Sequence, residues 1–266
     1  MDTLLATLST GDLRIIVLVV TFTALYLIES GIPFQRNDRK HLSSNLVLTI
    51  SVVLVNLMFS WITVFLLNWA EMNGLGVLRL IDLGTGATLV VSILFLDFWA
   101  AYLSHRIMHS VPALWSVHSI HHSDTMIDVS SAFRQHPLET VFRIFFHVTG
   151  ALILGIPVWM LGLYLLLSAA NGQLEHSNIS LPERVEKILR HFYTTPDTHK
   201  VHHSKIYKES NSNYGNLFCI WDRLFGTYLV IADVRNIRYG LDYLPDSKKS
   251  NSLGDLLTLN LKKDSE

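Results

Sequence analysis

The distribution of apolar residues constrains this chain more than any other feature of its sequence. They gather in four long stretches, at 13–28, 46–70, 87–103 and 141–170, instead of alternating with polar residues over short distances. Each stretch approaches or exceeds the roughly 20 residues that a helix needs to cross a bilayer. Charged residues make up 16% of the chain, against about 25% in a soluble domain. The sequence therefore predicts an all-α membrane protein with about four hydrophobic helical regions.

The first and the last of these stretches need separate interpretation. The stretch 13–28 has the length of a signal peptide, but no small-residue cleavage site follows it, so we expect a membrane span that begins near Thr10. The stretch 141–170 contains a Gly-Ile-Pro sequence at 155–157, and proline breaks helical hydrogen bonding. Two half-spans or a re-entrant hairpin fit this stretch better than one straight helix.

Basic residues predict the orientation of the chain in the membrane. Arg36, Arg39 and Lys40 lie between the first two apolar stretches, and such residues are enriched in cytoplasmic loops. The third stretch then returns the chain to the cytoplasm at Ser104. The later histidines can meet the earlier ones only if the stretch 141–170 enters and leaves the membrane by the same face, which a hairpin permits.

These arguments divide the chain into three regions. We expect N-terminal transmembrane helices in 1–103 and a histidine-rich catalytic region in 104–240, which includes the membrane hairpin at 141–170. A polar C-terminal tail follows at 241–266. The catalytic region is predicted to form a helical cap on the cytosolic side, holding a histidine-rich dimetal site.

Composition excludes several other kinds of site. Cys219 is the only cysteine, so an internal disulfide, a thiolate zinc finger and a four-cysteine iron–sulfur cluster are all impossible. The net charge of −1 and the lack of a basic stripe with interleaved aromatic residues give no sign of nucleic-acid binding.

Three histidine clusters stand out between Ser104 and Ser204. One has the pattern H-x-x-x-H and two have the pattern H-x-x-H-H. Residues three and four apart share a helix face, so each cluster presents several imidazoles in one direction, as helical metal ligands do. Chance occurrence is improbable, and eight crowded imidazoles would be hard to bury without ligands. The eight residues are His105, His109, His118, His121, His122, His199, His202 and His203.

The other histidines carry weaker signals. His176 directly follows the fourth apolar stretch and is expected to return to the same membrane face, which makes it a candidate ninth ligand. His136 is equally compatible with a role at the site, as a ligand or an orienting residue, and with a plain loop position. We interpret His41, His147 and His191 as ordinary structural or surface residues.

Eight or nine imidazoles are too many for one ion, so two ions with four or five ligands each are the natural division. Imidazole suits zinc, copper, iron and nickel. A position beside apolar spans favours the oxidation of unactivated C–H bonds with O₂ as co-substrate, for which two irons can supply the electrons jointly. The alternative is a membrane zinc-binding or metal-transport protein. Asp97 is its main acidic candidate inside a span, and a single such residue makes a poor path.

The histidine series resembles the fatty acid hydroxylase/sterol desaturase superfamily of membrane di-iron enzymes. Further stretches that match are FRQHPLE at 133–139, TPDTHKVHH at 195–203, NYG at 213–215 and WDRLFGT at 221–227. Only eight residues separate His109 from His118, which favours this group over the acyl-CoA desaturases. Within it, the chain is most similar to bacterial sterol-desaturase-like and alkylglycerol monooxygenase-like members.

The resemblance implies that the eight motif histidines bind the metals, with His176 as the matching isolated histidine. Five residues close to the motifs would orient ligands by accepting imidazole N–H bonds, with solvated or capping roles as the alternative. These residues are Asp124, Glu139, Glu175, Asp197 and Tyr214. The stretch 221–227 is expected to pack the cap instead of taking part in chemistry.

The resemblance also implies a lipid substrate, with sterol, fatty acyl, alkylglycerol and carotenoid lipids all open, and either hydroxylation or desaturation as the outcome. The sequence contains no cytochrome b₅ segment that could bind haem, so electrons are expected from a separate partner. This partner would be a reductase with a ferredoxin or cytochrome, or a pterin. A bacterial inner membrane and the endoplasmic reticulum both fit.

Overall fold

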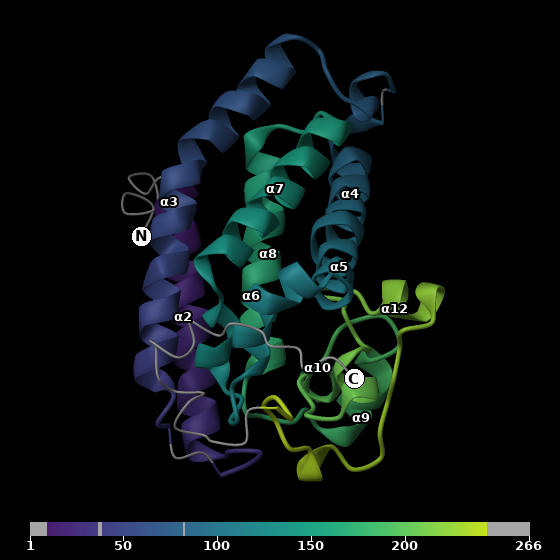
Figure 1. Ribbon diagram of the computed structural model, residues 1–266. Coiled ribbons are helices and arrows are strands. Elements are labelled where there is room, and N and C mark those ends of the chain that lie inside the picture. The colour runs from purple at the N-terminus through teal and green to yellow at the C-terminus, as the bar shows by residue number, and fades with distance from the viewer. Residues whose placement is uncertain (1–9, 37–38, 82, 244–266) are drawn as a thin grey trace, which may run out of the picture.

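The computed structural model describes residues 10–36, 39–81 and 83–243, and this part of the chain is helical, with one isolated β-bridge between Ser204 and Tyr239. Two long helices come first, α2 (Thr10–Gly31) and α3 (Leu42–Met72). In Figure 1 both lie toward the same edge of the molecule. The expectation of a helix beginning near Thr10 is confirmed.

The third apolar stretch is one continuous helix with an unusual middle. It begins as α4 (Gly84–Leu96), widens into the π-helix η2 (Asp97–Leu103) and ends as α5 (Ser104–Ser110). Wide turns of this kind occur most often at functional sites. Here the π-helix directly precedes His105, the first histidine of the clusters.

The fourth apolar stretch forms a helical hairpin, as predicted. Helix α7 (Pro137–Leu154) ends at Gly155, which adopts a left-handed conformation with φ 73°, and α8 (Val158–His176) begins after Pro157. Both helices run the same length of the molecule in opposite directions (Figure 1). The hairpin therefore starts and finishes at the same end.

Four helical segments are long and apolar enough to cross a bilayer, which agrees with the predicted number. These are Leu13–Gly31, Leu42–Arg79, Gly84–Ser110 and Pro137–Leu154. Their outer faces carry many exposed apolar side chains, of which Trp61 is 83% exposed. Such surfaces fit a lipid environment better than water.

The two ends of the bundle are built differently. At one end the hairpin turn packs against the loop after α3, where a Cβ added at Gly76 would overlap the backbone of Gly155. Arg79 Nε donates to the Gly155 carbonyl at 2.8 Å, next to the short helix η1 (Val77–Arg79). The opposite end carries the cap (Figure 1).

The cap consists of short helices, of which the first two lie between the third span and the hairpin and the others follow the hairpin. They are α6 (Pro112–His122), η3 (Val129–Phe133), α9 (Glu183–Leu189), α10 (Pro196–His202), α11 (Tyr207–Ser210), α12 (Ile220–Phe225) and η4 (Val234–Asn236). The predicted polar tail at 241–266 lies outside the described residues from position 244 onward.

Asp97 anchors the cap to the third span. Its buried carboxylate accepts hydrogen bonds from the backbone N–H groups of Leu217 at 3.0 Å and Phe218 at 3.2 Å, and from Trp221 Nε1 at 2.9 Å. The ring of Trp221 also lies 5.2 Å from the ring of Phe98. The stretch 221–227 thus packs the cap against the span, as expected, and Asp97 serves that packing.

Candidate metal centre

Nine buried or half-buried histidines converge at the cap end of the bundle in two groups, each able to hold a metal ion. Within each group the ring nitrogens that would act as ligands lie within 4.8 Å of one another. We call them the five-histidine group (His105, His109, His118, His122 and His202) and the four-histidine group (His121, His176, His199 and His203). They contain all nine histidines that the sequence singled out as ligand candidates.

Local helix signals place these side chains. Pro112 starts α6, and Thr195 caps α10 through reciprocal hydrogen bonds with Thr198, so both H-x-x-H-H patterns become helical. In both patterns the two residues four apart belong to one group, whereas the residue three after the first belongs to the other group. Each pattern is therefore divided between the two groups, and does not point to a single ion as the spacing alone suggested.

Three members of the five-histidine group have an outer nitrogen that faces a hydrogen-bond acceptor. His105 Nδ1 donates to the Tyr214 carbonyl at 3.0 Å, His118 Nδ1 to Glu139 Oε1 at 3.0 Å, and His202 Nδ1 to the Ser212 carbonyl at 2.7 Å. A proton on Nδ1 leaves Nε2 with a free lone pair. Nevertheless, Nε2 of His105 and Nε2 of His118 lie only 3.1 Å apart.

The four-histidine group shows the same arrangement. His176 Nδ1 donates to the Gly172 carbonyl at 2.7 Å and His121 Nδ1 to the Arg134 carbonyl at 3.3 Å. The two Nε2 atoms of these histidines then meet at 3.1 Å, and His176 Nε2 lies 3.1 Å from His199 Nε2 and 3.2 Å from His203 Nε2. Lone pairs that converge in this way repel unless a cation sits between them.

Unpartnered nitrogens support the same conclusion. Both ring nitrogens of His122 and Nε2 of His202 are buried without a hydrogen-bond partner, although buried polar atoms are nearly always satisfied. Burial, together with the neighbouring imidazoles, holds the pKa values of His122, His199 and His203 well below the usual range. Neutral imidazoles are the form that binds metal, so these residues fit a pair of metal ions.

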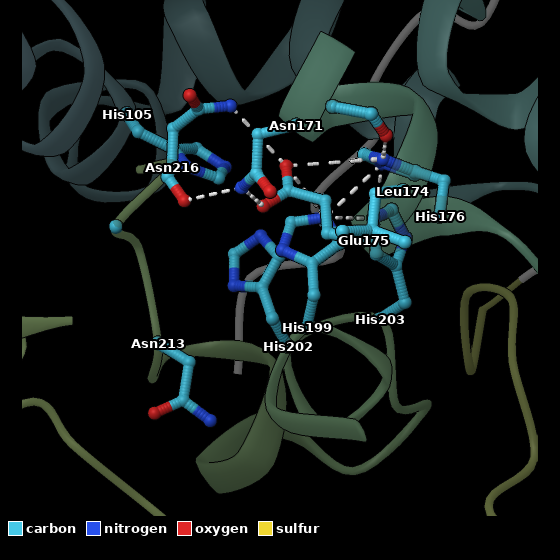
Figure 2. A network of polar contacts seen from close by, with 12 residues as sticks. His105, Asn171, Leu174, Glu175, His176, His199, His202, His203, Asn213 and Asn216 are labelled. Carbon is cyan, nitrogen blue, oxygen red and sulfur yellow. Dashed lines mark hydrogen bonds and ion pairs between the residues drawn. The ribbon is translucent and has the colours of Figure 1, made fainter. Parts of the chain in front are cut away.

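Three of the five orienting candidates from the sequence do contact or approach the groups. Glu139 accepts from His118 and also from Arg143 Nε at 2.9 Å. Tyr214 contributes through its backbone carbonyl, whereas its hydroxyl donates to Asn211. Glu175 lies beside His176 and His199, as Figure 2 shows.

The other two orienting candidates, and His136, have different partners. Asp124 accepts from His41 Nδ1 at 3.0 Å, and Asp197 accepts from Ser180 Oγ at 3.1 Å. His136 sits at the N-cap of α7, where its Nδ1 accepts from the backbone N–H of Leu138 at 3.1 Å. These hydrogen bonds lead to partners outside both histidine groups.

His41 has a more specific role than the sequence suggested. It is buried between Asp124 and Asp128, with its Nε2 2.9 Å from Asp128 Oδ2. Burial alone would lower the pKa of His41, but the hydrogen bonds and charges of the two aspartates raise it to about 10. This charged triad connects the start of α3 to the loop that follows the second histidine cluster. In the sequence, His41 simply follows a basic stretch, and nothing there indicated that it pairs with two aspartates.

Arg134 is a second residue whose role the sequence did not reveal. Its side chain is completely buried. The guanidinium donates to the Ile120 carbonyl at 2.9 Å, to Asn45 Oδ1 at 2.7 Å and to Ser123 Oγ at 2.9 Å. These contacts fix the end of α6, which carries His121.

A cavity of about 180 Å³ lies against the histidines. Its walls come from α3, the π-helix, α7 and α8, and include Arg143 and His147. Three members of the four-histidine group line it, His121, His176 and His199, but only His105 of the other group does. The two groups therefore differ in their access to this space.

The chain is similar in sequence to several known proteins. The chain is 33% identical over 127 residues to ornithine lipid hydroxylase OlsE of Rhizobium tropici, which covers 48% of this chain and 38% of that protein. It is 31% identical over 143 residues to alkylglycerol monooxygenase of Homo sapiens, covering 53% and 30%. A very-long-chain aldehyde decarbonylase of Oryza sativa subsp. japonica is 29% identical over 168 residues, covering 62% of each chain.

The chain thus spans less than half the length of the first two relatives. No solved structure matches it. The family model for fatty acid hydroxylase matches residues 89–227, which is just over half of the chain and contains every member of both histidine groups. The resemblance inferred from the motifs is therefore confirmed, and the chain belongs to the fatty acid hydroxylase family.

Proposed function

We propose that this protein is a membrane-bound di-iron oxidoreductase that uses O₂ to hydroxylate or desaturate a lipid-like substrate. The observation that carries the proposal is the pair of buried histidine groups with converging lone pairs, placed beside a cavity at the end of membrane-spanning helices. The relatives named above are lipid-modifying enzymes by their descriptions, which supports the substrate class.

Different residues of the chain would bind the ions and place the lipid. Each histidine group would bind one iron through its inward nitrogens, and Glu139 would keep His118 in the binding tautomer. Oxidation of an unactivated C–H bond by O₂ is the chemistry that such an iron pair would supply. The cavity walls on α3, α7 and α8 would place the lipid, with its apolar part between the spans.

The cytoplasmic face is the proposed location of the site. The loop with Arg39 and Lys40 lies at the histidine end of the bundle, since the backbone N–H of Phe34 donates to the carbonyl of Asn178, two residues after His176. Basic loops mark the cytoplasmic side. The functional division would then be anchoring by 1–103 and catalysis by 104–240, with electrons from a separate reductase and carrier protein, or from a pterin.

The metal-transport alternative is less well supported. Asp97 was its main intramembrane candidate, and its carboxylate is already occupied by three N–H donors from the cap. A transport path needs a series of polar groups that can exchange an ion. An ion-flux assay in liposomes would separate the two functions, because only a transporter moves zinc across the membrane.

The decisive experiment combines metal analysis with Mössbauer spectroscopy on protein purified anaerobically from ⁵⁷Fe-grown cells. Two irons per chain in a coupled centre, followed by O₂- and reductant-dependent turnover in a lipid screen, are the expected results. One zinc per chain, or no stoichiometric metal in folded protein, would overturn the di-iron assignment. Sterol, fatty acyl, alkylglycerol and carotenoid lipids belong in the same screen.

A further inference from the structure

The two histidine groups differ by one donor, and a buried carboxylate lies beside the smaller one. Glu175 immediately precedes His176 at the end of α8 and is 3% exposed. Its Oε2 accepts from Asn171 Nδ2 at 3.2 Å, and its Oε1 is 3.4 Å from Asn216 Nδ2 (Figure 2). Both partners are neutral amides, so neither balances the charge of an ionised carboxylate.

Glu175 approaches His199 from the side on which the nitrogens of the four-histidine group converge. Its Oε1 lies 3.8 Å from Nε2 of His199, the same nitrogen that faces His176 and His203. The distance is too long for a hydrogen bond, but adjacent ligands of one ion lie this far apart or closer. Glu139 behaves differently, because it meets the outer nitrogen of His118 and has Arg143 as a counter-ion.

A buried carboxylate without a cation is unfavourable because burial removes it from water. Within the part of the chain that the structure describes, only histidines lie within ion-pair distance of Glu175. A cation bound by the four-histidine group would supply the positive charge that an ionised Glu175 lacks. Glu175 also lines the cavity together with His121, His176 and His199.

We propose that Glu175 gives the four-histidine group a carboxylate oxygen as its fifth protein donor. This inference rests on the metal-binding part of the proposed function. One ion would have five nitrogen donors, whereas the other would have four nitrogens and one oxygen. The two ions would therefore be chemically unlike. The ion with the oxygen donor would be the one that faces the cavity.

The test compares Glu175→Gln with the wild type, using full-length protein loaded anaerobically with ⁵⁷Fe(II). Wild-type protein should hold two irons per chain with two distinct Mössbauer doublets. The variant should show an altered or missing doublet for one site only, and one of its irons should be lost to a chelator at least about 10-fold faster, the lower end of what loss of a supporting contact costs.

Glu186→Gln is the matched control. Glu186 is also a buried carboxylate of the cap, but it accepts from Thr195 Oγ1 at 2.7 Å, so both doublets should stay unchanged. Glu175→Asp, which withdraws the oxygen by one methylene, should alter the same doublet and keeps the test decisive if the glutamine variant does not fold.

The outcomes separate the two proposals. Two irons in the wild type, with doublets that neither Glu175 variant changes, would overturn the role of Glu175 and leave the proposed function intact. Fewer than two irons in folded wild-type protein would count against the proposed function itself and remove the basis of the inference with it.

Discussion

The two histidine groups are similar in geometry but differ in their surroundings. The five-histidine group contributes only His105 to the wall of the cavity, and the ring of Trp115 lies 4.8 Å from His109 and 5.3 Å from His122. The four-histidine group contributes three residues to the wall of the cavity. We therefore call the five-histidine group the enclosed group and the four-histidine group the open group. We infer that the enclosed group would retain its ion while the open group would receive O₂ and substrate.

The largest predicted effect tests this difference directly. His199→Ala reduces the open group to three histidines, and His122→Ala reduces the enclosed group to four. His199→Ala should therefore abolish lipid oxidation and lose one iron, with activity falling by more than about 100-fold, because even outer contacts cost about 10–100-fold. His122→Ala should weaken its iron less.

Iron content and turnover of the two purified variants would be measured together. His191→Ala is the control, since His191 is exposed and belongs to neither group. Equal iron loss in both histidine variants would contradict the inferred division between the groups.

Glu139→Gln should act on the enclosed group alone. The amide can still accept from His118 but loses the charge that holds the Nδ1–H tautomer and pairs with Arg143. We expect a 10–100-fold weaker affinity for one iron, measured by competition with a chelator. A change confined to the doublet of the four-histidine site would be the opposite of this expectation.

His41→Gln should destabilise the fold without altering the metal groups directly. It leaves two buried carboxylates without their shared cation, which costs about 3–5 kcal/mol. Because the folded pKa of His41 is about 10, above the ordinary value of about 6.5, the stabilisation is complete below pH 6.5 and is lost as the pH rises through 10. Thermal unfolding in detergent would measure it.

The difference between wild type and variant should therefore be constant from about pH 5 to 6.5 and shrink between pH 6.5 and 10. Asp124, whose pKa is held at about 2, remains ionised over this range. A difference that grows with rising pH would show that His41 is not charged in the fold.

Asp97→Asn should have the smallest effect of this series. The amide retains one acceptor oxygen for three N–H donors, so we expect a loss of about 1–3 kcal/mol in unfolding free energy, with both irons still bound. Loss of either iron would show that cap docking and metal binding cannot be separated.

The fold was predictable from the sequence where local signals decide it. Apolar length identified the spans, and the Gly-Ile-Pro sequence at 155–157 identified the hairpin. Histidine spacing selected eight of the nine residues that the structure brings together, because helical periodicity links spacing to direction. The ninth, His176, was selected by its position directly after the fourth apolar stretch.

What the sequence did not reveal depends on tertiary contacts. The division of each H-x-x-H-H pattern between two groups is set by how α5, α6, α8 and α10 pack. The carbonyls of Tyr214 and Ser212 orient histidines, yet every residue has a carbonyl, so no side-chain pattern marks them. The pairing of His41 with Asp124 joins residues that are distant in sequence.

Each histidine group combines residues from distant parts of the chain, and this has a consequence for biosynthesis. The enclosed group takes four residues from before the hairpin and His202 from after it, while the open group takes His121 from before the hairpin, His176 from the end of α8 and two residues from after it. A nascent chain therefore cannot complete the enclosed group before His202, or the open group before His203, has left the ribosome. Since bound metal adds its binding energy to folding, each ion would stabilise the fold only after synthesis had passed the hairpin and reached the last histidine of its group.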